Sequence, residues 1–194
     1  MIAHIEGTIA EINPTDIVID CNGVGYHINI SLNTYGIIKD LKRVKLFTSM
    51  IVREDAQLLF GFHDRQEREA FRLLILVNGI GPNTARMILS SMTSSEVFNS
   101  IVTGNATAFQ AVKGIGAKTA QRIILDLKDK VGKDIGTAEI PGSSYNTNAE
   151  EALSALVMLG FARNIANKAL QKVISNQGLN LSVEEFIRQA LKLL

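Results

Sequence analysis

The chain has 194 residues, of which 46% are hydrophobic and 20% are charged, with a formal net charge of +1. This is ordinary globular composition, enough for one to three small cored units, and the overall charge does not indicate a polyanionic partner. The single cysteine, Cys21, excludes an intrachain disulfide and fits a reducing compartment. We find neither a signal-peptide pattern at residue 1 nor an apolar run that would span a bilayer, so we expect a cytoplasmic protein with no membrane partner.

The charge is unevenly distributed along the chain. Residues 1–63 hold five basic against seven acidic residues, residues 64–136 hold ten against seven, and residues 137–194 hold five of each. The basic excess therefore falls in the middle third, although differences of this size are common between domains.

Residues 1–63 are predicted to form a β-domain. Apolar and polar residues alternate from Val24 to Leu32, which predicts a strand with Val24, Tyr26, Ile28, Ile30 and Leu32 on its buried face. Turn signals at 13–16 and 22–23 separate strands expected near 1–12, 16–21, 24–32, 44–52 and 56–62. Five short strands in one small unit favour a closed or partly open barrel such as an OB-fold.

The pattern changes to helical spacing at residue 64, and short helices are predicted up to residue 132. Residues 132–148 have no periodicity and contain Gly, Ser, Thr, Asn and Pro, which indicates a flexible linker. Three helices are then expected at 149–159, 163–176 and 182–194, the last starting at a capping box, Ser182 with Glu185. The chain is thus predicted to be an α+β multidomain protein with units at 1–63, 64–134 and 149–194 and a linker at 135–148.

A repeat lies within the helical region. Residues 78–88 align with residues 113–123 at an offset of 35, with six identities in eleven positions. Both copies centre on Gly-Ile-Gly, follow an apolar helix and open another. Two glycines around one apolar residue let the chain reverse tightly while the isoleucine enters the core. The next helix then begins with free N–H groups and the positive end of its dipole, which suits a phosphate.

The two hairpins are therefore the candidate DNA-binding site. They would contact backbone phosphates without reading base sequence. The candidate residues are Gly79, Gly81, Asn83, Thr84, Gly114, Gly116, Lys118 and Thr119. The alternative for a single hairpin is glycine used only as a helix cap. A nucleotide-binding loop at 114–119 is excluded, because Ala117 replaces the glycine before Lys-Thr and no strand precedes it.

With these motifs in hand, the chain resembles the RuvA family, the Holliday-junction-binding subunits of bacterial branch-migration complexes. Besides the hairpins, the resemblance rests on residues 23–26 (GVGY), 52–62 (VREDAQLLFGF) and 155–161 (ALVMLGF), and it covers nearly the full length. It implies an OB-fold barrel, a tandem helix-hairpin-helix domain and a three-helix domain of the ubiquitin-associated type on a linker.

The resemblance also implies function and partners. It implies a homotetramer, with an octamer on DNA left open, that opens a four-way junction for recombination and repair of DNA damage. A hexameric RuvB-type ATPase would drive branch migration and use the ATP, and a RuvC-type resolvase would be a further partner. The subunit itself would have no catalytic site and no cofactor.

The resemblance assigns further site residues. Glu54 and Asp55 would form an acidic pin at the junction centre, with Arg53 beside them available to a phosphate or to a neighbouring acid. Without the resemblance, adjacent acids in a turn are usually just solvated. Leu156, Leu159, Phe161 and Leu191 would contact the ATPase, although some of them must be core. Asn83 occupies a position where a basic residue is common in the family, so the first hairpin is expected to bind phosphate less strongly.

Two rival functions remain open at this stage. A helix-hairpin-helix glycosylase or nuclease would need a catalytic acid after a hairpin, for which Asp134 and Glu96 are the candidates. A protein adaptor would have hairpins that touch no DNA. No metal site is expected, because His4, His27 and His63 do not have metal-ligand spacing.

Overall fold

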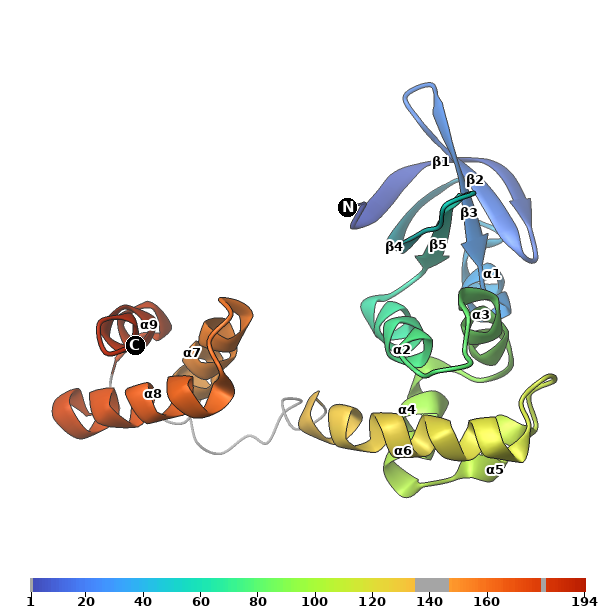
Figure 1. The fold of residues 1–194 in the computed structure, drawn as a ribbon. Helices are drawn as coiled ribbons and strands as arrows, with labels where there is room; N and C mark the ends of the chain where they lie inside the picture. The colour runs from blue at the N-terminus through green and yellow to red at the C-terminus, as the bar shows by residue number, and fades with distance from the viewer. Residues whose placement is uncertain (1, 135–146, 179–180) are drawn as a thin grey trace. The chain divides into compact units, whose positions relative to one another are not determined.

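The computed structural model describes residues 2–134, 147–178 and 181–194. The chain divides into two compact units, Met1–Gly136 and Thr137–Leu194, here called the N-terminal and C-terminal units (Figure 1). The predicted linker lies outside the described residues except at its end, where helix α7 (Thr147–Met158) begins two residues earlier than expected. None of the helices in the described ranges is long and apolar enough to cross a membrane.

The N-terminal unit begins with a five-stranded closed barrel in the order β1-β2-β3-β5-β4, which confirms the predicted barrel. Its strands are β1 (His4–Asn13), β2 (Asp16–Cys21), β3 (Val24–Ile30), β4 (Arg43–Val52) and β5 (Gln57–Phe62). All neighbours pair antiparallel except β3 and β5, which pair parallel at Asn29 with Phe60 and at Ile30 with Gly61. Gly61 is required there, since a Cβ would lie 2.6 Å from the Ile28 side chain.

The expected strand from Val24 to Leu32 begins at Val24 as predicted, but it ends at Ile30, and Val24 is not buried. Ile28 and Ile30 are buried, but Val24 is 54% exposed, next to the turn at Gly23. After Ile30 the chain enters a short helix, α1 (Leu32–Ile38), whose N-cap is Ser31. The Ser31 hydroxyl accepts the Thr34 N–H at 3.0 Å, so the strand ends where a polar side chain caps the helix.

The barrel has an interior core of its own, and its strand β5 also packs into the core of the following helices. The helices are α2 (Arg65–Ile75), α3 (Pro82–Ser91), α4 (Ser94–Thr103), α5 (Ala106–Gln110) and α6 (Ala117–Asp134). Phe71 of α2 packs on Phe60 and Phe62 of β5, with ring centroids 5.0 Å apart in both pairs. The predicted hairpin plugs Ile80 and Ile115 belong to the same core. Barrel and hairpins are thus joined by buried apolar contact.

The C-terminal unit consists of α7 (Thr147–Met158), α8 (Arg163–Gln177) and α9 (Val183–Leu191) around a small core of its own. The predicted capping box is present, because Ser182 and Glu185 exchange side-chain to backbone hydrogen bonds. Helix α7 ends at Met158, and the turn that follows contains Gly160, which has φ +101°. The Phe161 N–H then returns to the Leu156 carbonyl at 3.2 Å, closing the helix end.

Candidate nucleic-acid interface

The two Gly-Ile-Gly segments fold into hairpins with the same backbone geometry. The first glycine of each lies in the left-handed region, with φ +93° at Gly79 and +89° at Gly114. A side chain at either position would be strained, which explains the glycine. Ile80 and Ile115 are both only 5% exposed, and their N–H groups donate to the carbonyls of Val77 and Val112. The repeat in sequence is therefore a repeat in structure.

Each hairpin leaves backbone amides at a helix start, with one fewer in the first, where Pro82 has no N–H. The Ala85 N–H donates to the Gly81 carbonyl at 2.9 Å, and the Ala120 N–H donates to the Gly116 carbonyl at 3.0 Å. The amides ahead of these bonds have no carbonyl within their helix to bind, and the helix dipole adds positive potential there. A Cβ at Gly81 or Gly116 would meet no protein atom within 4 Å, so the surface before these amides is open.

The polar side chains at the two helix starts differ. Asn83 is exposed in the first hairpin, and Lys118 is exposed at the matching position in the second. Thr84 and Thr119 are half-buried, one on each helix. The second hairpin therefore adds a full positive charge to its amides, whereas the first adds only a neutral amide group.

Arg122 is a further candidate for the interface that was not singled out from the sequence. It lies on α6 four residues after Lys118, which places both on one face of the helix. Its Nη1 also donates to the Asn78 carbonyl at 3.4 Å, so α6 contacts the loop before the first hairpin. The signal for it in the sequence was the i, i+4 spacing of two basic residues.

The segment with Arg53, Glu54 and Asp55 forms the tight turn between β4 and β5, where the Arg53 N–H donates to the Ala56 carbonyl at 2.8 Å. The expected location at a hairpin tip is thereby confirmed. All three side chains are exposed, and no ion pair involves them within the described residues. The turn presents two carboxylates to solvent on a barrel whose strand β5 packs into the same core as the hairpins.

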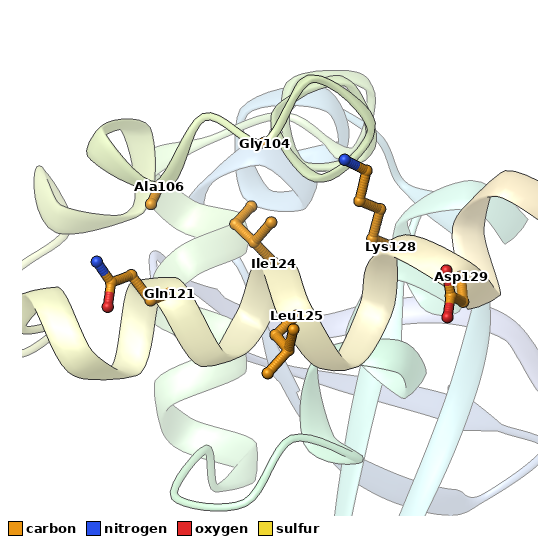
Figure 2. Close-up of a pocket in the computed structure, with 7 residues that line it drawn as sticks. All are labelled: Gly104, Ala106, Gln121, Ile124, Leu125, Lys128 and Asp129. Atoms are coloured by element: carbon orange, nitrogen blue, oxygen red, sulfur yellow. The ribbon is translucent and has the colours of Figure 1, made fainter.

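A shallow groove lies where α6 passes the connection between α4 and α5 (Figure 2). Figure 2 shows Ile124 directed toward the segment with Gly104 and Ala106, while Leu125 projects from α6 and is 80% exposed. Lys128 and Asp129 are the charged residues of its lining. Its lining therefore holds one carboxylate, Asp129, and not the pair of carboxylates that glycoside hydrolysis uses.

The residues considered for a glycosylase or nuclease have other roles or positions. Glu96 accepts the Thr93 N–H at 2.8 Å as part of a capping box at the start of α4. Hydrogen bonds from the Thr93 backbone and hydroxyl lower the pKa of Glu96, which suits an anionic cap rather than an acid catalyst. Asp134 is the last residue of α6 and not part of a loop. Across the described ranges, no three His, Cys, Asp or Glu side chains gather to hold a metal ion.

In the C-terminal unit, the four residues predicted to contact a partner differ in burial. Leu156 is fully buried in the core, so its assignment to a contact surface was wrong. Leu159 is 62% exposed and Leu191 is 44% exposed, whereas Phe161 packs partly against the core. Met158, which was not predicted, is 89% exposed beside Leu159. The helical period alone could not sort these residues, because the packing of the three helices decides which of them are buried.

Fold and site together define a class: a tandem helix-hairpin-helix protein whose N-terminal domain is a closed five-stranded barrel. Three family models match the chain, described as RuvA N terminal domain over residues 1–61, SAM-like Helix-hairpin-helix tandem over 71–129, and RuvA, C-terminal domain over 147–194.

Full-length relatives agree with these matches. The chain is 50% identical to a protein of Flavobacterium psychrophilum and 51% identical to one of Christiangramia forsetii, each over 99% of both chains. It is 49% identical to a Bacteroides fragilis protein, again over 99% of both chains. All three are named Holliday junction branch migration complex subunit RuvA. The chain belongs to the RuvA family.

Proposed function

We propose that this protein binds four-way DNA junctions through their backbone phosphates and acts as the junction-binding, non-catalytic subunit of a branch-migration complex. The observation that carries the proposal is the pair of matching hairpins, with open amides at Gly81 and Gly116, on a unit that also presents the acidic turn. Backbone amides and Lys118 recognise phosphate and not base edges. The names of the full-length relatives support the same function.

The acidic turn supplies junction preference in this proposal. Carboxylates repel phosphates, so Glu54 and Asp55 favour a position where strands diverge over a place against a continuous duplex. A homotetramer accounts for four arms, because a closed symmetric ring gives each copy one arm to hold. Arg53 lies at the edge of the turn, within the same segment, and would hold a phosphate there.

A gel-shift titration tests the junction claim directly. Four-way, three-way and linear DNA of equal length and base composition are compared at one salt concentration. We expect the tightest binding to the four-way junction. Equal affinity for all three substrates would reject junction recognition while leaving phosphate binding in place.

The Glu54→Gln, Asp55→Asn double variant tests the role of the turn. It removes two negative charges and keeps the side-chain shapes, so junction binding should stay equal or become tighter, while the rate of branch migration changes. Clearly weaker junction binding by a folded double variant would mean that these acids organise the barrel or the assembly.

The C-terminal unit is proposed to recruit a hexameric RuvB-type ATPase through the exposed apolar residues Met158, Leu159 and Leu191. Truncation after Gly136, where the N-terminal unit ends, should leave junction binding nearly unchanged and abolish ATPase-driven branch migration. Leu159→Ala should weaken recruitment with the helices intact by circular dichroism. Full branch migration by the truncated protein would show that the ATPase docks elsewhere.

A further inference from the structure

A buried carboxylate lies where the barrel meets the helices. Glu67, on the first turn of α2, is only 2% exposed. It accepts hydrogen bonds from the Ser31 hydroxyl and from the Thr34 hydroxyl at 2.5 Å, both at the start of α1. His63, which follows β5, approaches the same carboxylate through Nδ1 at 2.9 Å. A buried acid is costly unless it is fully partnered, and here three groups from two elements partner it.

The imidazole of His63 completes this cluster electrostatically. Its Nε2 lies 2.8 Å from Asp64, so both ring nitrogens face carboxylates. The hydrogen bond to Glu67 raises the pKa of His63, against the opposing effect of burial, and favours the charged ring. The backbone N–H of His63 also donates to the Thr34 hydroxyl at 3.1 Å. Glu67 therefore has both a cationic partner and a shared network with α1.

Helix α1 connects this cluster to the first hairpin through hydrogen bonds to α3. Asn33 donates to the carbonyls of Leu89 and Met92, at 2.7 and 3.0 Å, at the end of α3. The Leu32 N–H donates to the Ser90 hydroxyl at 3.1 Å. Helix α3 is the helix that the first hairpin opens at Gly81. The path thus runs from Glu67 through α1 to the helix that presents the first row of amides.

A second contact holds α3 to the barrel. Arg86 donates to the Thr15 carbonyl at 2.9 Å and to the Asn29 side chain at 3.0 Å. In the described part of the chain, no such hydrogen bond joins the second hairpin or α6 to a barrel residue. The first hairpin is therefore the one whose position relative to the acidic turn is fixed by polar contacts.

We propose that Glu67 is a positioning residue whose buried carboxylate fixes the first hairpin relative to the acidic turn and thereby sets the preference for branched over linear DNA. The inference rests on the proposed function above. A linear duplex needs only the amides of the hairpins, but a junction must meet the hairpins and the turn together. We call Glu67 and its partners Ser31, Thr34 and His63 the anchor. Removing hydrogen bonds from the anchor should therefore reduce junction affinity and leave duplex affinity nearly unchanged.

The test uses the full-length protein and two matched comparisons. Glu67→Gln removes the buried charge, and Glu69→Gln removes a charge from the same helix at a site that is 52% exposed and outside the network. Thr34→Val removes the hydroxyl that donates to Glu67, while Thr34→Ser keeps it. Dissociation constants for a four-way junction and a linear duplex are measured for each folded variant.

For Glu67→Gln and Thr34→Val we expect the ratio of junction to duplex affinity to fall by about tenfold, the size of a typical coupling between two sites. Glu69→Gln and Thr34→Ser should keep the wild-type ratio. An unchanged ratio in folded Glu67→Gln, or an equal loss for both substrates, would overturn the inference. If Glu67→Gln fails to fold, the Thr34 pair decides by the same criteria. A wild-type protein without junction preference would instead reject the proposed function.

Discussion

The two hairpins have the same backbone and different surroundings. Both place a glycine at positive φ and an isoleucine in the core, and both open a helix with unpartnered amides. The first is joined to the barrel through Asn33 and Arg86 but presents only the neutral Asn83. The second has no polar contact to described barrel residues but presents Lys118 with Arg122. The two copies of the motif therefore differ: the first is held against the barrel by hydrogen bonds, and the second carries the positive charge.

The largest expected effect comes from placing a carboxylate before the amides. Gly81 is the N-cap of α3, with φ −86° and ψ 170°, a conformation in which Asp caps a helix well. Gly81→Asp and Gly116→Asp should therefore fold, yet each should lower DNA affinity by about tenfold or more, because like charges about 4 Å apart repel by ~1 to 4 kcal/mol. Binding is measured by fluorescence anisotropy.

The matched controls are Gly81→Asn and Gly116→Asn, which cap the same amides without a charge. They should lose clearly less affinity than the Asp variants. Equal loss in the Asp and Asn variants would mean that shape, and not phosphate repulsion, explains the result. Normal binding by both folded Asp variants would remove the hairpins from the DNA site.

The next largest effect is a difference in DNA affinity between variants at Lys118 and variants at Asn83. Lys118→Ala should weaken binding to every sequence alike and reduce the slope of log affinity against log salt by about 1, since one phosphate contact is lost. Asn83→Ala should change binding by no more than ~0.5 kcal/mol. Asn83→Lys should tighten binding. If Asn83→Ala costs as much as Lys118→Ala, the two hairpins do not differ in DNA affinity as proposed.

The smallest effect concerns the pH dependence of the anchor. The pKa of His63 is raised in the folded protein, chiefly by its hydrogen bond to Glu67, so protonated His63 stabilises the fold. That contribution is fully present below the unfolded value of 6.5 and is lost as pH rises through the higher folded pKa. Urea unfolding at a series of pH values from 6 upward should show this loss in the wild type.

His63→Asn provides the control for that experiment, because it removes the titrating group and should flatten the pH dependence. The second hairpin offers no comparable group, since His4, His27 and His63 are the only histidines of the chain. A wild-type stability that rises over this pH range relative to His63→Asn would reverse the assigned sign.

The features that could be predicted from the sequence are those that local sequence patterns determine. The five strands, the repeat at 79–81 and 114–116 and the cap at Ser182 all depend on residues close together in the chain, where turn chemistry and periodicity act. Helix α1 escaped prediction because seven residues give too short a period, and its cap, Ser31, reads as the polar face of a strand.

The anchor around Glu67 could not be predicted either, because its partners Ser31 and Thr34 lie more than thirty positions away and meet it only through the fold. Leu156 shows the same limit in the C-terminal unit. Its apolar character fits both a core and a contact surface, and only the packing of the three helices decides for the core.

In the function proposed here, the hairpins hold DNA by its phosphates and the barrel makes the binding selective for junctions. The most direct measurement is an equilibrium titration of the wild-type protein with a four-way junction and a linear duplex over a series of salt concentrations, repeated with permuted base sequences. We predict tighter junction binding, a linear fall of log affinity with log salt for both substrates, and no effect of the permutation. Affinity that is insensitive to salt, or that depends on one base sequence, would contradict it.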